Sequence, residues 1–98
     1  MFIYNVTITI ENDIHAEWLD WMKKIHIPDV MGTTCFVENR ICKLLSEEPE
    51  ITYAVQYTFR QMDDLHNYQK EFAPKLQKEH ADRFKEKFAA FRTVLEII

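Results

Sequence analysis

Two segments of strict alternation constrain the fold of this chain more than any other feature of its sequence. In residues 2–10, FIYNVTITI, every second side chain from Tyr4 to Ile10 is large and apolar, and most of those between them are polar. Residues 51–59, ITYAVQYTF, repeat the pattern with three aromatic side chains on the apolar face. Because successive side chains of a strand point to opposite faces of a sheet, both segments predict half-buried strands.

The segment after the first strand predicts a helix from about residue 14 to residue 26. Plotted at 100° per residue, the large apolar side chains share one face: Ile14, Trp18, Trp21, Met22 and Ile25. Pro28 cannot continue a regular helix, and Gly32, the single glycine, suits a positive φ, so a sharp turn is predicted over residues 28–32. His26 is then expected at the helix end, where a protonated imidazole interacts favourably with the negative pole.

The remaining elements are predicted from composition and from the positions of prolines and polar loops. Residues 35–45 have strand composition, and the polar loop 46–50 connects them to residues 51–59 in a predicted antiparallel hairpin. Residues 62–87 have helical periodicity with Pro74 inside it, which predicts a kink or two abutting helices. Residues 88–98, rich in aromatic and β-branched side chains, predict a last strand.

This order of elements is that of the α+β ferredoxin-like βαββαβ fold, a four-stranded antiparallel sheet with two helices on one face. The first and third strands are expected to be central, with their apolar side chains under the helices. The uncovered face is expected to carry Asn5 and Gln56, flanked by Arg92 and Glu96. The length suits a single domain over residues 1–98, and a chain this short buries only roughly two thirds of its unfolded surface, which favours oligomerisation.

Charge and hydropathy exclude several partners. The chain has 12 basic and 16 acidic residues, a net charge of -4, and its basic residues between Lys70 and Arg92 alternate with acidic ones, which disfavours nucleic acid. No apolar run reaches the ~18 residues needed to span a bilayer, and no secretory signal is apparent. Cys35 and Cys42, expected on opposite faces of one strand, are too far apart to form a disulfide. A cytoplasmic protein with no membrane partner is predicted.

Six runs of the sequence carry a family resemblance: YNVTITI, IHAEWLDWM, HIPDVMGTTCF, TYAVQYTF, FAPKLQKEHADRF and FAAFRTVLEII. Together they resemble an uncharacterised bacterial family of about this length, a domain of unknown function. That family is similar to the dimeric α/β-barrel superfamily, in which two ferredoxin-like subunits bring their open sheet faces together. The resemblance implies a homodimer with a barrel-like interior and brings no established activity.

Four residues are candidates for ligand contact: Asn5, His26, Gln56 and Arg92. Some dimeric α/β-barrel proteins are cofactor-independent oxygenases or haem-degrading enzymes, and the latter use an Asn on the first strand with a Trp and a His. Asn5 matches the first of these residues by strand and facing. The structural alternatives are a polar sheet face for Asn5 and a helix cap for His26. His80, on the apolar stripe of the second helix, is expected to be a hydrogen-bonded histidine at the core edge rather than a general base.

No cofactor or metal site is predicted. The four histidines have no i,i+4 pair, and His66 and His80 are about 21 Å apart along their helix at ~1.5 Å per residue. A single glycine excludes a glycine-rich phosphate loop. RNA stacking on strand aromatics is disfavoured, because exposing Tyr53 and Tyr57 would bury the polar side chains between them.

Two classes of function remain. The favoured one is a small homodimeric protein that binds a small molecule or serves as an accessory protein. The alternative is a cofactor-independent oxygenase or isomerase acting on a small organic substrate inside the barrel. The enzyme hypothesis predicts that Asn5, Gln56 and Arg92 converge on an enclosed pocket.

Overall fold

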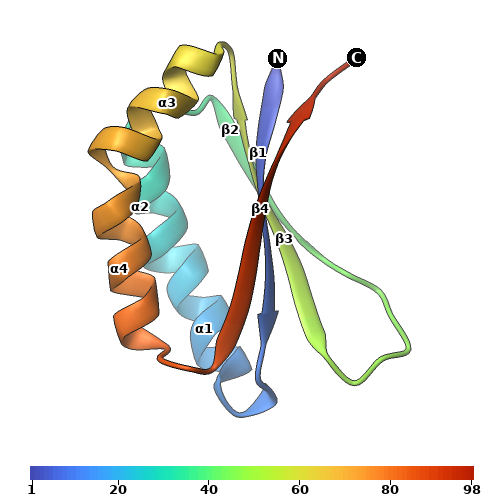
Figure 1. Cartoon of the computed structure of the whole chain (residues 1–98). Coiled ribbons are helices and arrows are strands. Elements are labelled where there is room, and N and C mark those ends of the chain that lie inside the picture. Colours follow the sequence, from blue (N-terminus) through green and yellow to red (C-terminus); the bar gives the residue numbers. More distant parts are fainter.

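A computed structural model describes all of residues 1–98 as one antiparallel sheet whose helices lie on a single face (Figure 1). The elements follow in chain order: β1 (Phe2–Ile10), a 3-10 turn (Asn12–Ile14), α1 (His15–Trp21), a π-helical segment η2 (Met22–His26), α2 (Ile27–Gly32), β2 (Glu38–Lys43), β3 (Ile51–Phe59), α3 (Met62–Glu71), α4 (Ala73–Arg83) and β4 (Phe88–Glu96). None of the helices is both long and apolar enough to cross a membrane.

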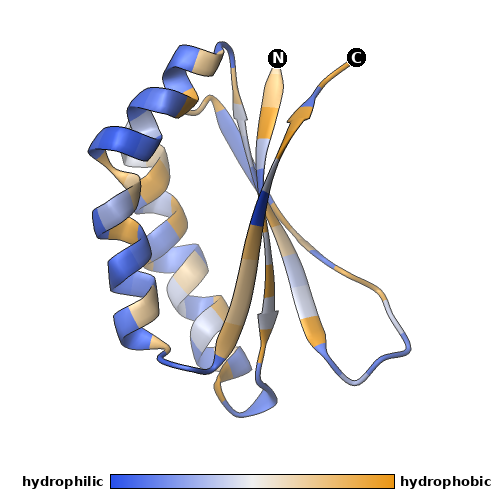
Figure 2. Cartoon of the chain, viewed as in Figure 1, coloured by the Kyte–Doolittle hydropathy of each residue, from blue (hydrophilic) through white to orange (hydrophobic).

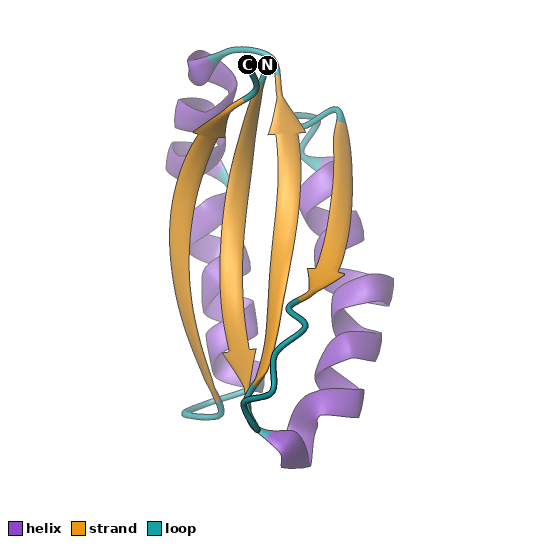
Figure 3. Ribbon diagram, turned by 90° about the vertical axis from the view of Figure 1, so that its right-hand side faces the viewer, coloured by secondary structure: helices purple, strands orange, loops and turns teal.

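The sheet has the order β2-β3-β1-β4, and all neighbouring strands are antiparallel. This confirms the ferredoxin-like fold and the central positions of β1 and β3. Viewed toward the uncovered face, the four strands lie in front of all the helices (Figure 3). The second strand is shorter than predicted, so Cys35 precedes it in a buried position while Cys42 lies within it and is exposed. Both thiols are free.

The alternation of β1 and β3 determines where the core lies. The side chains predicted to face the helices are buried, among them Tyr4 and Val55, and they pack against Trp18 of α1 and Leu65 of α3. Burial of each large apolar side chain contributes roughly 1.5–3 kcal/mol, so this face supplies most of the favourable energy of folding. Hydrophilic colour dominates the outward side of α4, whereas hydrophobic colour lies near both ends of β4 (Figure 2).

The first helix does not stop at Pro28, and the turn predicted over residues 28–32 is wrong. Helical backbone runs through α1, η2 and α2 without interruption. Proline lacks an N–H, and its ring crowds the carbonyl four residues earlier in a regular helix. In η2 the hydrogen bonds reach one residue further, as where the Ile27 N–H donates to the Met22 carbonyl. This wider turn accommodates Pro28 at the start of α2, where its missing N–H is tolerated.

The π turn also changes which side chains face the sheet. It adds a residue to one turn, so the buried face moves from the predicted Ile25, which is 48% exposed, to Ile27 and Val30. His26 consequently lies inside a continuous helix, not at its end as predicted. The chain reverses later, where Thr34 adopts a φ of 64°, and no glycine has positive φ, so the role expected for Gly32 is also wrong.

The second helical region divides as the sequence predicts. α3 ends at Glu71 and α4 begins at Ala73, with Pro74 in its first turn. Gln61 and Asp64 form a reciprocal capping box at the start of α3. α4 ends at Arg83, before the predicted boundary at residue 87, and β4 follows.

Candidate functional site

The polar residues of the open sheet face are bonded to one another. The Asn5 amide nitrogen donates to Thr7 Oγ1 at 3.1 Å and to Thr93 Oγ1 at 3.2 Å. The Gln56 side-chain amide donates to Asn5 Oδ1 at 3.1 Å. Asn5 and Gln56 share the open face, as predicted, where they pair across β1 and β3, and their hydrogen bonds join three strands. Neither Asn5 nor Gln56 lines the cavity described next.

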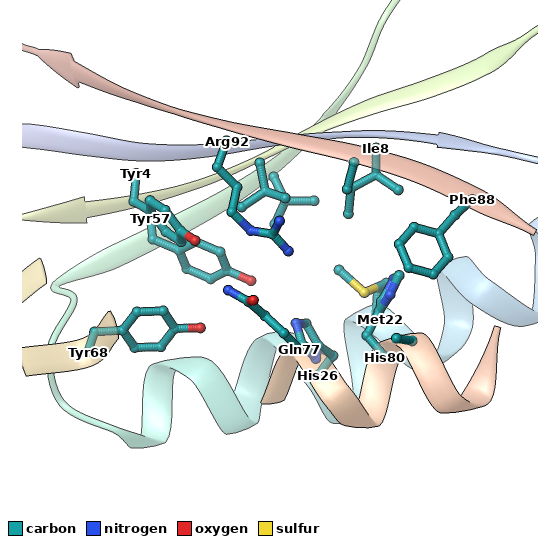
Figure 4. A pocket seen from close by; sticks show the side chains of 14 residues that line it. Tyr4, Ile8, Met22, His26, Tyr57, Tyr68, Gln77, His80, Phe88 and Arg92 are labelled. Carbon is teal, nitrogen blue, oxygen red and sulfur yellow. The ribbon is translucent and has the colours of Figure 1, made fainter. Parts of the chain in front are cut away.

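A cavity of about 270 Å³ lies on the other side of the sheet, between its covered face and the helices. Fourteen residues from β1, η2, β3, α3, α4 and β4 line it. Ten of them are hydrophobic: Tyr4, Val6, Ile8, Met22, Val55, Tyr57, Tyr68, Ala81, Phe88 and Ala90. The other four are His26, Gln77, His80 and Arg92. Their side chains converge from the sheet above and the helices below (Figure 4).

Arg92 belongs to this cavity and not to the open face. It pairs with Val6 in the β1–β4 register, and residues directly opposite in an antiparallel pair share a face. Glu96, opposite Phe2, lies on the same covered side. The prediction that Arg92 and Glu96 flank the uncovered face is therefore wrong. Asn5, Gln56 and Arg92 therefore do not converge, which removes the geometry on which the enzyme hypothesis depended.

His80, which lines the cavity, is hydrogen-bonded to the buried Trp18 behind it. The Trp18 indole N–H donates to His80 Nε2 at 2.9 Å, and Trp18 is fully buried. An indole N–H can only donate, so Nε2 must hold a lone pair and the proton of neutral His80 is on Nδ1. Burial lowers the pKa of His80 to about 4, with smaller contributions from His26 and Arg92. The prediction of a hydrogen-bonded histidine at the core edge is confirmed.

His26 lies next to this pair. Its ring stacks on Trp21 at a centroid distance of 5.1 Å and is 5.7 Å from the ring of His80. Burial lowers the pKa of His26 to about 4, Asp29 acts in the opposite direction, and Arg92 lowers it further. Its Nδ1 is buried without a hydrogen-bond partner. Both imidazoles are therefore neutral at physiological pH.

Three tyrosines and a glutamine form the other end of the cavity (Figure 4). Burial raises the pKa of Tyr4, and the adjacent Arg92 and Gln77 partly oppose this effect. Burial also raises the pKa of Tyr57 and of Tyr68 strongly. All three hydroxyls remain protonated at neutral pH and are able to donate hydrogen bonds.

Of the predicted ligand residues, only His26 and Arg92 line the cavity, whereas Asn5 and Gln56 lie together on the open face. Sequence reasoning missed Gln77 and Tyr68 as cavity residues. The stripe of Tyr68 and His80 on one helical face was visible in the sequence, but nothing distinguished Gln77 from a solvent-exposed polar residue. No cluster of three or more His, Cys, Asp or Glu side chains is arranged to hold a metal ion.

The strand order and the helices on one face of the sheet define a ferredoxin-like α+β protein, with a cavity between the sheet and the helices. Within that class, the chain belongs to the family described as domain of unknown function DUF4286, which matches residues 1–98. The predicted resemblance to a family of unknown function is thereby confirmed. A comparison with curated proteins found no match.

Solved structures with the same fold cover nearly the whole chain. A substituted form of MhuD with two manganese protoporphyrin IX molecules bound per active site has a TM-score of 0.72 and 12% identity, covering 100% of this chain and 95% of that one. A dimeric ferredoxin-like protein from an uncultured marine organism has a TM-score of 0.71 and 12% identity, covering 99% and 96%. An ethyl tert-butyl ether D (EthD) family protein from Bacillus halodurans has a TM-score of 0.69 and 10% identity, covering 100% of both. At these identities the likeness establishes the fold alone.

Proposed function

We propose that this protein is a homodimer that binds a small, largely apolar organic molecule in the cavity between sheet and helices. The observation that carries the proposal is the cavity itself, about 270 Å³ lined by ten hydrophobic residues and a few convergent polar ones. Small-molecule sites commonly combine an apolar lining with a few polar groups that fix orientation, and this volume is near the lower end of their range.

The open sheet face supports the dimer. Phe91 is 62% exposed and Leu95 is 43% exposed, and both lie on this face because they pair with Thr7 and Ile3. The polar network around Asn5 satisfies its own hydrogen bonds, so a second subunit can cover it without leaving those groups unpaired. Some structures with this fold are described as dimeric, which is consistent with the same arrangement here.

A cytoplasmic location without a nucleic-acid partner completes the proposal. Two free cysteines, one of them exposed, suit a reducing compartment. The net charge of -4 opposes binding to a polyanion.

A native mass spectrum of gently purified protein tests subunit number and bound ligand together. We expect a dimer with added mass that is lost on denaturation. Ala90, which lines the cavity, supplies the blocking variant: Ala90→Phe should remove the added mass, whereas Ala16→Phe on the exposed surface of α1 should retain it. A bare monomer would contradict the proposal.

A second candidate, a cofactor-independent oxygenase or isomerase, is favoured by the neutral imidazole of His26 in the cavity. His26 is unprotonated at neutral pH and its Nδ1 has no hydrogen-bond partner, so it can accept a proton from a bound substrate. A pKa of about 4 makes it a weak base, which is why binding is the first proposal. Conversion of the extracted ligand by wild-type protein, abolished in His26→Asn with binding retained, would establish the enzyme.

A further inference from the structure

We propose that the cavity recognises an organic carboxylate: a molecule with an apolar body and a single carboxylate that pairs with Arg92. This inference rests on the proposed function, because it names the class of ligand that the same cavity takes. Three observations support it. Arg92 has no acidic partner, hydrogen-bond donors lie beside it, and large apolar side chains lie at the other end of the cavity.

Arg92 is the only cationic side chain of the cavity, and it has no acidic partner. No Asp or Glu lines the cavity, although the chain as a whole has an excess of acidic residues. The ion pairs of the structure join other residues, such as Lys24 with Asp20 at 2.8 Å and Lys87 with Asp13 at 3.0 Å. A guanidinium presents a planar fork of donors that fits a carboxylate in a bidentate manner.

The positive charge of Arg92 acts electrostatically on titratable groups at both ends of the cavity. Its charge contributes to lowering the pKa of both His26 and His80 and acts on Tyr4 and Tyr68 as well. Asp29, the acidic group that acts on His26, does not line the cavity. A ligand in this space therefore meets a net positive environment within an acidic protein.

The neutral polar groups add donors of the same kind. Trp18 occupies the Nε2 lone pair of His80, so the other nitrogen of His80 carries the proton and can only donate. The Gln77 amide and the tyrosine hydroxyls supply further donors beside Arg92 (Figure 4). A cavity so rich in donors is best matched by acceptor oxygens that carry negative charge.

The residue types that line the cavity favour a ligand with a carboxylate over one with a phosphate. A doubly charged phosphate is usually held by several cations or by backbone N–H groups of a helix N-terminus or glycine-rich loop, and the residues that line this cavity include one cation and no glycine. Ile8, Met22 and Phe88 lie at the end away from the tyrosines, where the ring of His80 is 4.3 Å from that of Phe88 (Figure 4). That end accommodates a hydrocarbon or aromatic body, with the carboxylate directed toward Arg92.

The test compares two probes of nearly equal shape, 2-naphthoate and its neutral analogue 2-naphthamide, by calorimetric titration. Wild-type protein should bind the naphthoate roughly 10- to 100-fold more tightly, the range expected for a charge-assisted hydrogen-bonded pair. Arg92→Gln should remove this preference and leave naphthamide binding unchanged. The matched control Arg60→Gln, at an exposed position after β3, should retain it. Arg92→Lys, which keeps the charge without the fork, should lie between the two.

The outcomes separate the two proposals. Equal binding of both probes by wild-type protein, or a preference that survives in Arg92→Gln, would overturn the carboxylate inference and leave the apolar pocket intact. Binding of neither probe would overturn the pocket and the inference together. A thermal melt of each variant checks that it is folded, which is expected because Arg92 is exposed on an edge strand.

Discussion

The two faces of the sheet use polar residues in opposite ways. On the open face, Asn5, Gln56 and Thr93 satisfy one another across three strands. On the covered face, beside the cavity, Arg92 has no acidic partner and His26 Nδ1 has no hydrogen-bond partner. Polar groups that are already paired tolerate being covered by another subunit, whereas unpaired ones next to a cavity are the groups that gain by contacting a ligand.

Removing the Trp18 side chain should have the largest effect on stability, because this side chain packs in the core beneath the covered face of the sheet. Trp18→Ala leaves a large cavity and leaves His80 Nε2 without its donor. The free energy of unfolding should fall by roughly 3–5 kcal/mol, measured by urea denaturation. Lys23→Ala on the exposed side of the same helix serves as control and should change stability by less than about 0.5 kcal/mol. A loss below about 1 kcal/mol in Trp18→Ala would mean that the packing of Trp18 contributes little to the stability of the fold.

The second largest effect should be a loss of stability at acid pH, caused by the two histidines beneath the covered face. The pKa values of His26 and His80 are lowered from 6.5 to about 4 in the folded protein, so the unfolded chain binds more protons between these pH values. Stability is therefore fully present above pH 6.5 and falls as pH decreases toward 4, by up to roughly 3 kcal/mol from His80. Urea denaturation at pH 7.5 and pH 5 measures the loss, which His80→Gln should reduce. An identical pH dependence in that variant would contradict the assigned pKa.

Breaking the open-face network should mainly affect association. Asn5→Ala leaves Gln56 and Thr93 without their partner in the covered interface, at a cost of roughly 1–3 kcal/mol. The dimer dissociation constant from sedimentation equilibrium should rise by roughly 10- to 100-fold. Asn39→Ala, at an exposed position of β2, is the control and should leave it unchanged. Unchanged association in Asn5→Ala would show that the open face is not the interface.

Much of the fold could be predicted because the alternation of β1 and β3 is local. The side chain of each residue in a strand is directed by its own position, so the buried set from Tyr4 to Phe59 followed from the sequence. The π turn could not be predicted in this way. It arises because helical backbone continues through Pro28 under the packing of Val30 and Ile27, which outweighs the local tendency of proline to end a helix.

The cavity was the part that local reasoning could not assemble. Placing Arg92 requires the register between β4 and β1, and a shift of one residue moves a side chain to the opposite face. The sequence identified His26 and Arg92 as candidates, but their common location depends on the π turn and on that register together.

An NMR titration with 2-naphthoate, observing side-chain amide signals, tests the division between the two faces most directly. Asn5 and Gln56 report on the open face, and Gln77 reports on the cavity, all in one spectrum. The account predicts that the Gln77 amide signals shift during the titration while those of Asn5 and Gln56 remain in place. Shifts at Asn5 and Gln56 with an unchanged Gln77 would contradict it and move the ligand site to the open face.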